Sequence, residues 1–143
     1  MSVEFLFSVA STLALVGWVT LALVPRWPMA RALAGVVLPL VLAAVYLTLV
    51  VRYMPGAQGG FGSLAQVALL FQQPELLLAG WIHYLAFDLF IGGWETRDAV
   101  RHDIPRLLVI SCLALTFMLG PIGLLSYFLV RSQRLRALSV EPT

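Results

Sequence analysis

Long apolar segments constrain the fold of this chain more than any other feature. A helix needs about 20 apolar residues to cross a hydrocarbon core of about 30 Å. Four segments meet that length, namely residues 3–24, 33–51, 76–94 and 107–130. Of these, the segment 76–94 alone contains a histidine and an aspartate, His83 and Asp88, and the other three are free of charge except for Glu4 at the rim of the first. The sequence therefore predicts an all-α integral membrane protein with four transmembrane helices, forming a single domain over residues 1–143.

The composition agrees with a chain that lies in lipid. Hydrophobic residues make up 61% of it and charged residues 11%, whereas a soluble domain is about 25% charged. All nine basic residues are arginines, and they lie in short connections between apolar segments rather than on one face. This pattern argues against nucleic-acid binding and favours membrane lipids as partners, because arginine at the headgroups remains solvated.

The connection before the third apolar segment is longer than the others. It contains Pro55-Gly56 and Gly59-Gly60, followed by an apolar run over residues 61–71 that is too short to cross a membrane. We expect a short interfacial or re-entrant helix over residues 61–71, with the glycines allowing the backbone to turn.

The first apolar segment is interpreted as a retained anchor. No basic residue precedes it, Glu4 lies where a signal peptide is positive, and the run exceeds a signal core of about 7–15 residues. Four spans place both termini on one side of the membrane. The arginines then divide four against five, with Arg52, Arg131, Arg134 and Arg136 on the side of the termini. This division leaves the orientation open.

Asp88 is the most informative residue, because a charged side chain at the centre of a bilayer costs about 2.5–3.5 kcal/mol on insertion scales. At 100° per residue, Tyr84, Asp88 and Glu95 share one stripe of a helix, whereas His83 lies about 140° away from Asp88. A carboxyl group and an imidazole that flank one apolar cavity can act as acid and base. The structural alternative is that both side chains only fix helix packing.

A divalent metal is a further possibility for the same helix. Glu95, Asp98 and His102 are spaced i, i+3, i+7 and would converge if the helix extended past residue 94. Two carboxylates and a histidine suit iron, manganese or zinc. The alternative is ordinary interfacial ion pairing, for example of Asp98 with Arg101. Two histidines exclude the multi-histidine sites of membrane di-iron oxygenases.

The segment 107–130 contributes packing features. Thr116, Gly120, Gly123 and Tyr127 form a small-residue stripe, which favours close helix contacts within the chain or in a homo-oligomer. Pro121 removes a backbone donor and leaves the carbonyl of Phe117 without its helical partner, so we expect a kink there, as at Pro39 in the second segment.

Two sequence blocks resemble a small family of membrane proteins. The first is GWIHYLAFDLFIG at residues 80–92, followed by Trp94 and Asp98, and the second is LGPIGLL at residues 119–125, followed by Tyr127 and Arg131. They are similar to the abscisic-acid-deficiency-four-like, or neoxanthin synthase-like, family, and the similarity extends over almost the whole chain. The resemblance implies a bacterial member in the inner membrane, because no plastid transit sequence is present.

The resemblance also implies a chemistry. Plant members act in the conversion of violaxanthin to neoxanthin, an epoxide-to-allene isomerisation that consumes no redox cofactor. If this chemistry carries over, Asp88 or His83 protonates an epoxide oxygen while the other removes a carbon-bound proton, with Tyr84 in the same motif. The implied partner is a lipophilic small molecule, either a carotenoid or another isoprenoid.

Three functions remain open from the sequence. The first is a cofactor-independent isomerase of a carotenoid or isoprenoid. The second is a non-catalytic protein that binds such a lipid or assembles with a biosynthetic enzyme. The third is a metal-dependent enzyme that uses Glu95, Asp98 and His102. A proton or metal pathway is disfavoured, because charges occupy one apolar segment and a continuous route normally draws on several.

Overall fold

The computed structural model describes residues 2–135, and this range is helical with no strand. The elements in chain order are α1 (Val3–Leu23), α2 (Pro28–Ala32), the π-helical segment η1 (Leu33–Val37), α3 (Leu38–Tyr53), α4 (Leu64–Leu70), α5 (Pro74–Arg101), α6 (Arg106–Leu119) and α7 (Pro121–Leu135). The all-α class predicted from the sequence is confirmed for these residues.

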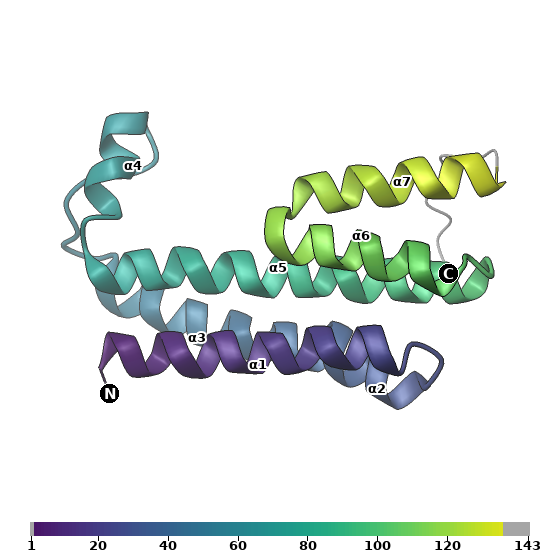
Figure 1. The fold of residues 1–143 in the computed structure, drawn as a ribbon. Coiled ribbons are helices and arrows are strands. Elements are labelled where there is room, and N and C mark those ends of the chain that lie inside the picture. The colour runs from purple at the N-terminus through teal and green to yellow at the C-terminus, as the bar shows by residue number, and fades with distance from the viewer. Residues whose placement is uncertain (1, 136–143) are drawn as a thin grey trace.

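Three helices are long and apolar enough to cross a membrane. They are α1, the continuous helix Pro28–Tyr53 that α2, η1 and α3 form together, and α5, which is 28 residues long. These helices run side by side along the length of the molecule (Figure 1). Large apolar side chains on their outer surfaces face outward, and Leu40, Leu47 and Phe87 are between 60% and 64% exposed. Such a surface is suited to lipid, and the chain is a membrane protein.

Glycines allow the three long helices to approach one another closely. A Cβ atom added at Gly35 in η1 would lie 2.8 Å from the Cα atom of Gly93 in α5. One added at Gly17 in α1 would lie 2.8 Å from the Leu89 side chain. A π-helical segment of five residues, η1, lies just before Pro39, where the sequence predicts a kink. Such segments change the direction of side chains within a continuous helix.

The last two helices form a hairpin instead of a membrane span. α6 ends at Leu119, and α7 begins at Pro121. Gly120 between them has a φ of 36°, a positive value that favours glycine. The two helices run antiparallel, and the hairpin covers only the second half of α5 (Figure 1). At about 1.5 Å per residue the 14-residue α6 is about 21 Å long, short of the about 30 Å of a hydrocarbon core.

The prediction of one continuous helix over residues 107–130 is wrong, because this segment forms the two helices of the hairpin. The expected kink at Pro121 is a complete reversal of the chain, because Gly120 provides a conformation that a helix cannot contain. The small-residue stripe serves this reversal: a Cβ atom at Gly123 would overlap the backbone of Thr116, so α6 and α7 meet there. The end of α7 therefore lies at the same end of the molecule as the start of α6 (Figure 1).

The connection before α5 contains the expected short helix, with slightly different bounds. Ser63 caps α4 by accepting a hydrogen bond from the backbone N–H of Gln66 at 3.3 Å. α4 projects away from the three long helices at the end where α5 begins (Figure 1). Phe71 joins this region to α5, since its ring would lie 3.2 Å from a Cβ atom placed at Gly80. This position fits an interfacial helix better than one that enters the membrane beside α5.

Candidate functional site

The candidate site is the polar face of α5 and the hairpin packed against it. Tyr84, Asp88, Glu95 and Asp98 follow one another along this face, as the helical spacing predicts. The hairpin supplies the partners of these side chains from two segments that lie 20 to 35 residues further along the chain. Three separate groups of contacts result, and they differ in what each carboxyl group meets.

The first group anchors α7 on the end of α5. The Tyr127 hydroxyl donates to Asp98 Oδ2 at 2.7 Å, and Arg131 Nε donates to the same oxygen at 2.8 Å. His102 Nδ1 lies 3.4 Å from Asp98 Oδ1. Arg131 is 2% exposed, so the ion pair is buried and hydrogen-bonded. Removing one partner of such a pair leaves an uncompensated charge, and this group is therefore suited to hold the hairpin in place.

The second group joins α5 to α6. Glu95 is fully buried, and Thr116 Oγ1 lies 3.0 and 3.1 Å from its two carboxyl oxygens. The same hydroxyl lies 3.0 Å from the backbone carbonyl of Cys112. A hydroxyl group has one proton to donate, so Thr116 serves one of these acceptors at a time.

The third group lies at the tip of the hairpin and involves Asp88, which occupies the middle of α5. Its carboxyl oxygens would lie 2.9 and 3.0 Å from a Cβ atom at Gly120, so the absence of a side chain there makes room for them. Asp88 Oδ2 is buried and has no hydrogen-bond partner among the described residues. This atom is the one buried side-chain oxygen or nitrogen of the described residues that has no such partner.

Tyr84 lies one helical turn before Asp88 on the same stripe of α5. The Tyr84 hydroxyl donates to the backbone carbonyl of Phe117 at 2.8 Å. This carbonyl is the one that Pro121 deprives of its helical partner, as the sequence predicts. Tyr84 therefore supplies a hydrogen-bond donor to a backbone carbonyl at the end of α6, and it places a phenol near Asp88.

His83 lies on another side of α5. It is exposed on the outer surface, where its ring stacks on Phe87 at 4.6 Å between centroids and lies 5.6 Å from the Tyr46 ring. The structure does not bring His83 and Asp88 together. Tyr84, on the same stripe as Asp88, is the ionisable neighbour that the structure provides in its place.

Glu95, Asp98 and His102 are also not brought together as a metal-binding group. Glu95 faces Thr116, whereas Asp98 faces Tyr127 and Arg131. Among the described residues, no group of three or more histidine, cysteine, aspartate or glutamate side chains is placed to hold a metal ion. The donor set proposed from the i, i+3, i+7 spacing is thus used for contacts within the protein.

The sequence interpretation missed the roles of Thr116, Tyr127 and Arg131. A continuous helix over residues 107–130 would place Tyr127 and Arg131 at the opposite end of the membrane from Asp98. The stripe that contains Thr116 and Tyr127 was a visible signal, but small residues at that spacing indicate packing only. Pairing them with the carboxyl groups of α5 requires the reversal at Gly120.

The first half of α5 lies beyond the hairpin and presents aromatic rings on the face that leads to Asp88. Trp81 Nε1 donates to Ser11 Oγ in α1 at 3.1 Å, which fixes the indole. Its ring lies 5.6 Å from Phe7 and 5.3 Å from Tyr84. A shallow pocket of about 380 Å³ adjoins Trp81, with walls from the starts of α1 and α5. Aromatic side chains therefore extend from this pocket along α5 to Tyr84, one helical turn before Asp88.

These features define the class of the protein: a helical membrane protein in which a half-length hairpin covers a carboxylate-bearing helix. The chain belongs to the ABA DEFICIENT 4-like family, whose family model matches residues 5–127. The match includes Tyr84, Asp88, Glu95, Thr116 and the Gly120-Pro121 turn, and confirms the family suggested by the two sequence blocks. Neither the curated proteins nor the solved structures give a match to this chain.

Proposed function

We propose that this protein is a membrane-embedded isomerase that acts on a carotenoid or another isoprenoid lipid by acid–base chemistry. The observation that carries the proposal is the carboxyl group of Asp88, which has an unpartnered buried oxygen at the hairpin tip and Tyr84 one helical turn before it. An acidic group in the middle of a membrane-spanning helix is costly, and such groups usually have a function. Family membership supports the choice of an isoprenoid substrate.

The aromatic surface beyond the hairpin supports an elongated substrate. From Leu77, which lines the shallow pocket, to Asp88 is eleven residues, or about 16 Å along the helix. Flat aromatic rings along this path provide broad apolar contacts for a polyene. The substrate reaches Asp88 sideways from the lipid, with its reactive end at the hairpin tip and its chain along Trp81 and Phe7.

The chemistry needs two proton transfers and no oxidant. A base removes a carbon-bound proton, and the electron pair of that C–H bond forms a new C=C bond. The C–O bond of an epoxide breaks, its electron pair goes to oxygen, and an acid delivers a proton there. Substrate and product are therefore isomers, as in the reaction of the plant members. Asp88 takes the carbon-bound proton in this proposal, and the Tyr84 hydroxyl turns from the Phe117 carbonyl to give its proton to the oxygen. The proton held by Asp88 then passes to the Tyr84 oxygen, which restores both groups.

The assignment is tested by turnover of violaxanthin in proteoliposomes, with the products separated by chromatography. General acid–base catalysis contributes about 10²–10⁴-fold, so we expect Asp88→Asn to lower turnover by at least about 10²-fold. Glu75→Gln is the matched control, because it removes a carboxylate at the start of the same helix. Turnover by Asp88→Asn at the level of Glu75→Gln would contradict a catalytic Asp88.

A non-catalytic lipid-binding protein is the second candidate. The buried contacts of Asp98 with Tyr127 and Arg131 favour it, because they show that polar groups of α5 serve to hold the hairpin. In that case Asp88→Asn lowers the thermal stability or the amount of bound lipid, and wild-type protein converts no substrate. Measuring stability and turnover on the same samples separates the two candidates.

A further inference from the structure

A second cavity lies at the other end of the molecule, apart from Asp88. It has a volume of about 390 Å³ and lies between the end of α1, the end of α5 and the start of α6. Its walls are mostly apolar and include Leu21, Val109, Ile110 and Leu113. The volume falls in the range of about 300–1,000 Å³ typical of ligand pockets. Neither Asp88 nor Tyr84 lines it, so it is separate from the proposed isomerase site.

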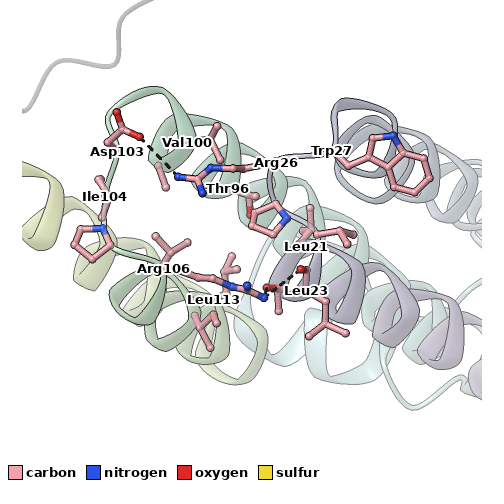
Figure 2. A pocket seen from close by; sticks show the side chains of 17 residues that line it. Leu21, Leu23, Arg26, Trp27, Thr96, Val100, Asp103, Ile104, Arg106 and Leu113 are labelled. Carbon is pink, nitrogen blue, oxygen red and sulfur yellow. Dashed lines mark hydrogen bonds and ion pairs between the residues drawn. The ribbon is translucent and has the colours of Figure 1, made fainter.

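Two arginines, Arg26 and Arg106, line this cavity. Figure 2 shows Arg106 reaching from α6 to the end of α1, where its Nη2 donates to the carbonyls of Ala22 and Leu23 at 3.0 and 3.1 Å. These contacts hold the guanidinium in one place. Arg26 lies on another side of the space, and its Nη2 is 3.9 Å from Asp103 Oδ1. Both side chains of this pair are more than 80% exposed, and such a pair is weak.

The hairpin gathers positive charge at the same end of the molecule. Because α6 and α7 return to the end where α5 finishes, this end contains all the described arginines except Arg52, namely Arg26, Arg31, Arg97, Arg101, Arg106, Arg131 and Arg134. The described acids here are fewer, and Asp98 is already paired with Arg131. Anionic lipids are attracted to such a surface by about 1 kcal/mol for each nearby basic residue.

We propose that this cavity binds one acyl chain of an anionic phospholipid, with the phosphate held between Arg26 and Arg106. The apolar walls suit the chain, and the two guanidinium groups suit the phosphate oxygens. The long Arg26–Asp103 pair opens to admit the headgroup. An isoprenoid substrate is less suited to this cavity, because its conversion would need a buried acid or base. Asp103 is the one acid among the lining residues, and its side chain is exposed to solvent.

Native mass spectrometry of the purified protein, titrated with phosphatidylglycerol or phosphatidylcholine, tests the proposal. We expect one tightly bound phosphatidylglycerol and no comparable phosphatidylcholine. Loss of a single arginine contact corresponds to about fivefold weaker binding, so Arg26→Gln should weaken phosphatidylglycerol binding by about that factor. Arg52→Gln, at the opposite end, is the matched control and should leave binding unchanged.

A second pair of variants tests the cavity itself. Ile110→Trp fills it, whereas Ser111→Trp adds the same ring to the exposed side of α6. We expect Ile110→Trp to remove the bound phosphatidylglycerol and Ser111→Trp to retain it. The proposal would be overturned by equal binding of the two lipids, or by equal effects of Arg26→Gln and Arg52→Gln. It would also be overturned if Ile110→Trp displaced a bound isoprenoid from the purified protein. None of these results depends on isomerase activity.

Discussion

At the scale of single residues, the polar face of α5 divides into side chains that hold the fold and one that is free to react. Glu95 and Asp98 have partners in the hairpin, whereas Asp88 keeps an unpartnered oxygen. The sequence indicated the importance of Asp88 and Tyr84 because burial of polar groups in an apolar segment is costly. It could not indicate which acids had partners, since those partners come from the other side of a turn.

Arg131→Leu tests the structural role of the Asp98 group. The substitution leaves the Asp98 carboxylate buried without its arginine partner, and we expect it to cost about 3–5 kcal/mol of stability. The thermal unfolding temperature in detergent measures the change. Arg134→Leu is the control, because Arg134 is exposed on the same helix. Similar unfolding temperatures for the two variants would contradict a buried, stabilising ion pair.

Thr116→Val tests the contact between α5 and α6. Valine has nearly the shape of threonine but no hydroxyl, so Glu95 loses the hydrogen bond seen at 3.0 Å, and we expect a loss of about 1–3 kcal/mol. Thr48→Val is the matched control, because the Thr48 hydroxyl donates only to the backbone carbonyl of Ala44 in its own helix. Thermal unfolding should separate the variants. An equal effect of both would show that Glu95 does not depend on Thr116.

At the scale of elements, helix positions followed from apolar length, but the division of the last segment did not. The three spans overlap the predicted ones. The second is extended from residues 33–51 to Pro28–Tyr53, and α5 is extended from residues 76–94 to Pro74–Arg101. Residues 107–130 have enough apolar length for a span, so hydropathy cannot distinguish a span from a hairpin of two short helices. The local signal was Gly120-Pro121, and its consequence depends on what the polar residues of α6 and α7 meet on α5.

Gly120→Ala tests the turn that forms the hairpin. A Cβ atom there would face a positive φ of 36° and lie 2.9 Å from Asp88 Oδ1, so we expect both lower stability and a displaced Asp88. Gly56→Ala is the control, since Gly56 also has a positive φ but no atom within 4 Å of the added carbon. The unfolding temperature should fall further for Gly120→Ala. An equal fall would mean that backbone strain alone matters at the hairpin tip.

At the scale of the whole molecule, the hairpin changes the distribution of charge. Four spans divide the arginines almost equally between the two sides, whereas the hairpin moves Arg131 and Arg134 to the side of Arg26 and Arg101. Arg136, which the sequence count also used, lies outside the described residues. Basic residues in short connections favour the cytoplasmic side. We therefore expect the arginine-rich end to face the cytoplasm, an orientation that the sequence alone left open.

Labelling of single introduced cysteines in intact cells checks this topology. With the hairpin, Gln58→Cys and Gln133→Cys lie on opposite sides, so a membrane-impermeant thiol reagent should label position 58 and reach position 133 only after permeabilisation. The parent protein, whose Cys112 is buried, is the background control. Labelling of both positions from outside, or of neither, would instead support four spans. The reverse pattern would retain the hairpin and contradict the orientation.

The identity of the lipid that copurifies with the protein tests the central claim, which is that Asp88 isomerises an isoprenoid held along α5. Wild-type and Asp88→Asn proteins are purified from a host that makes epoxycarotenoids, and their bound lipids are compared by mass spectrometry, chromatography and absorbance. We predict a polyene of the same mass in both, isomerised in the wild type and unconverted in Asp88→Asn. No bound polyene, or the same isomer in both proteins, would contradict the account.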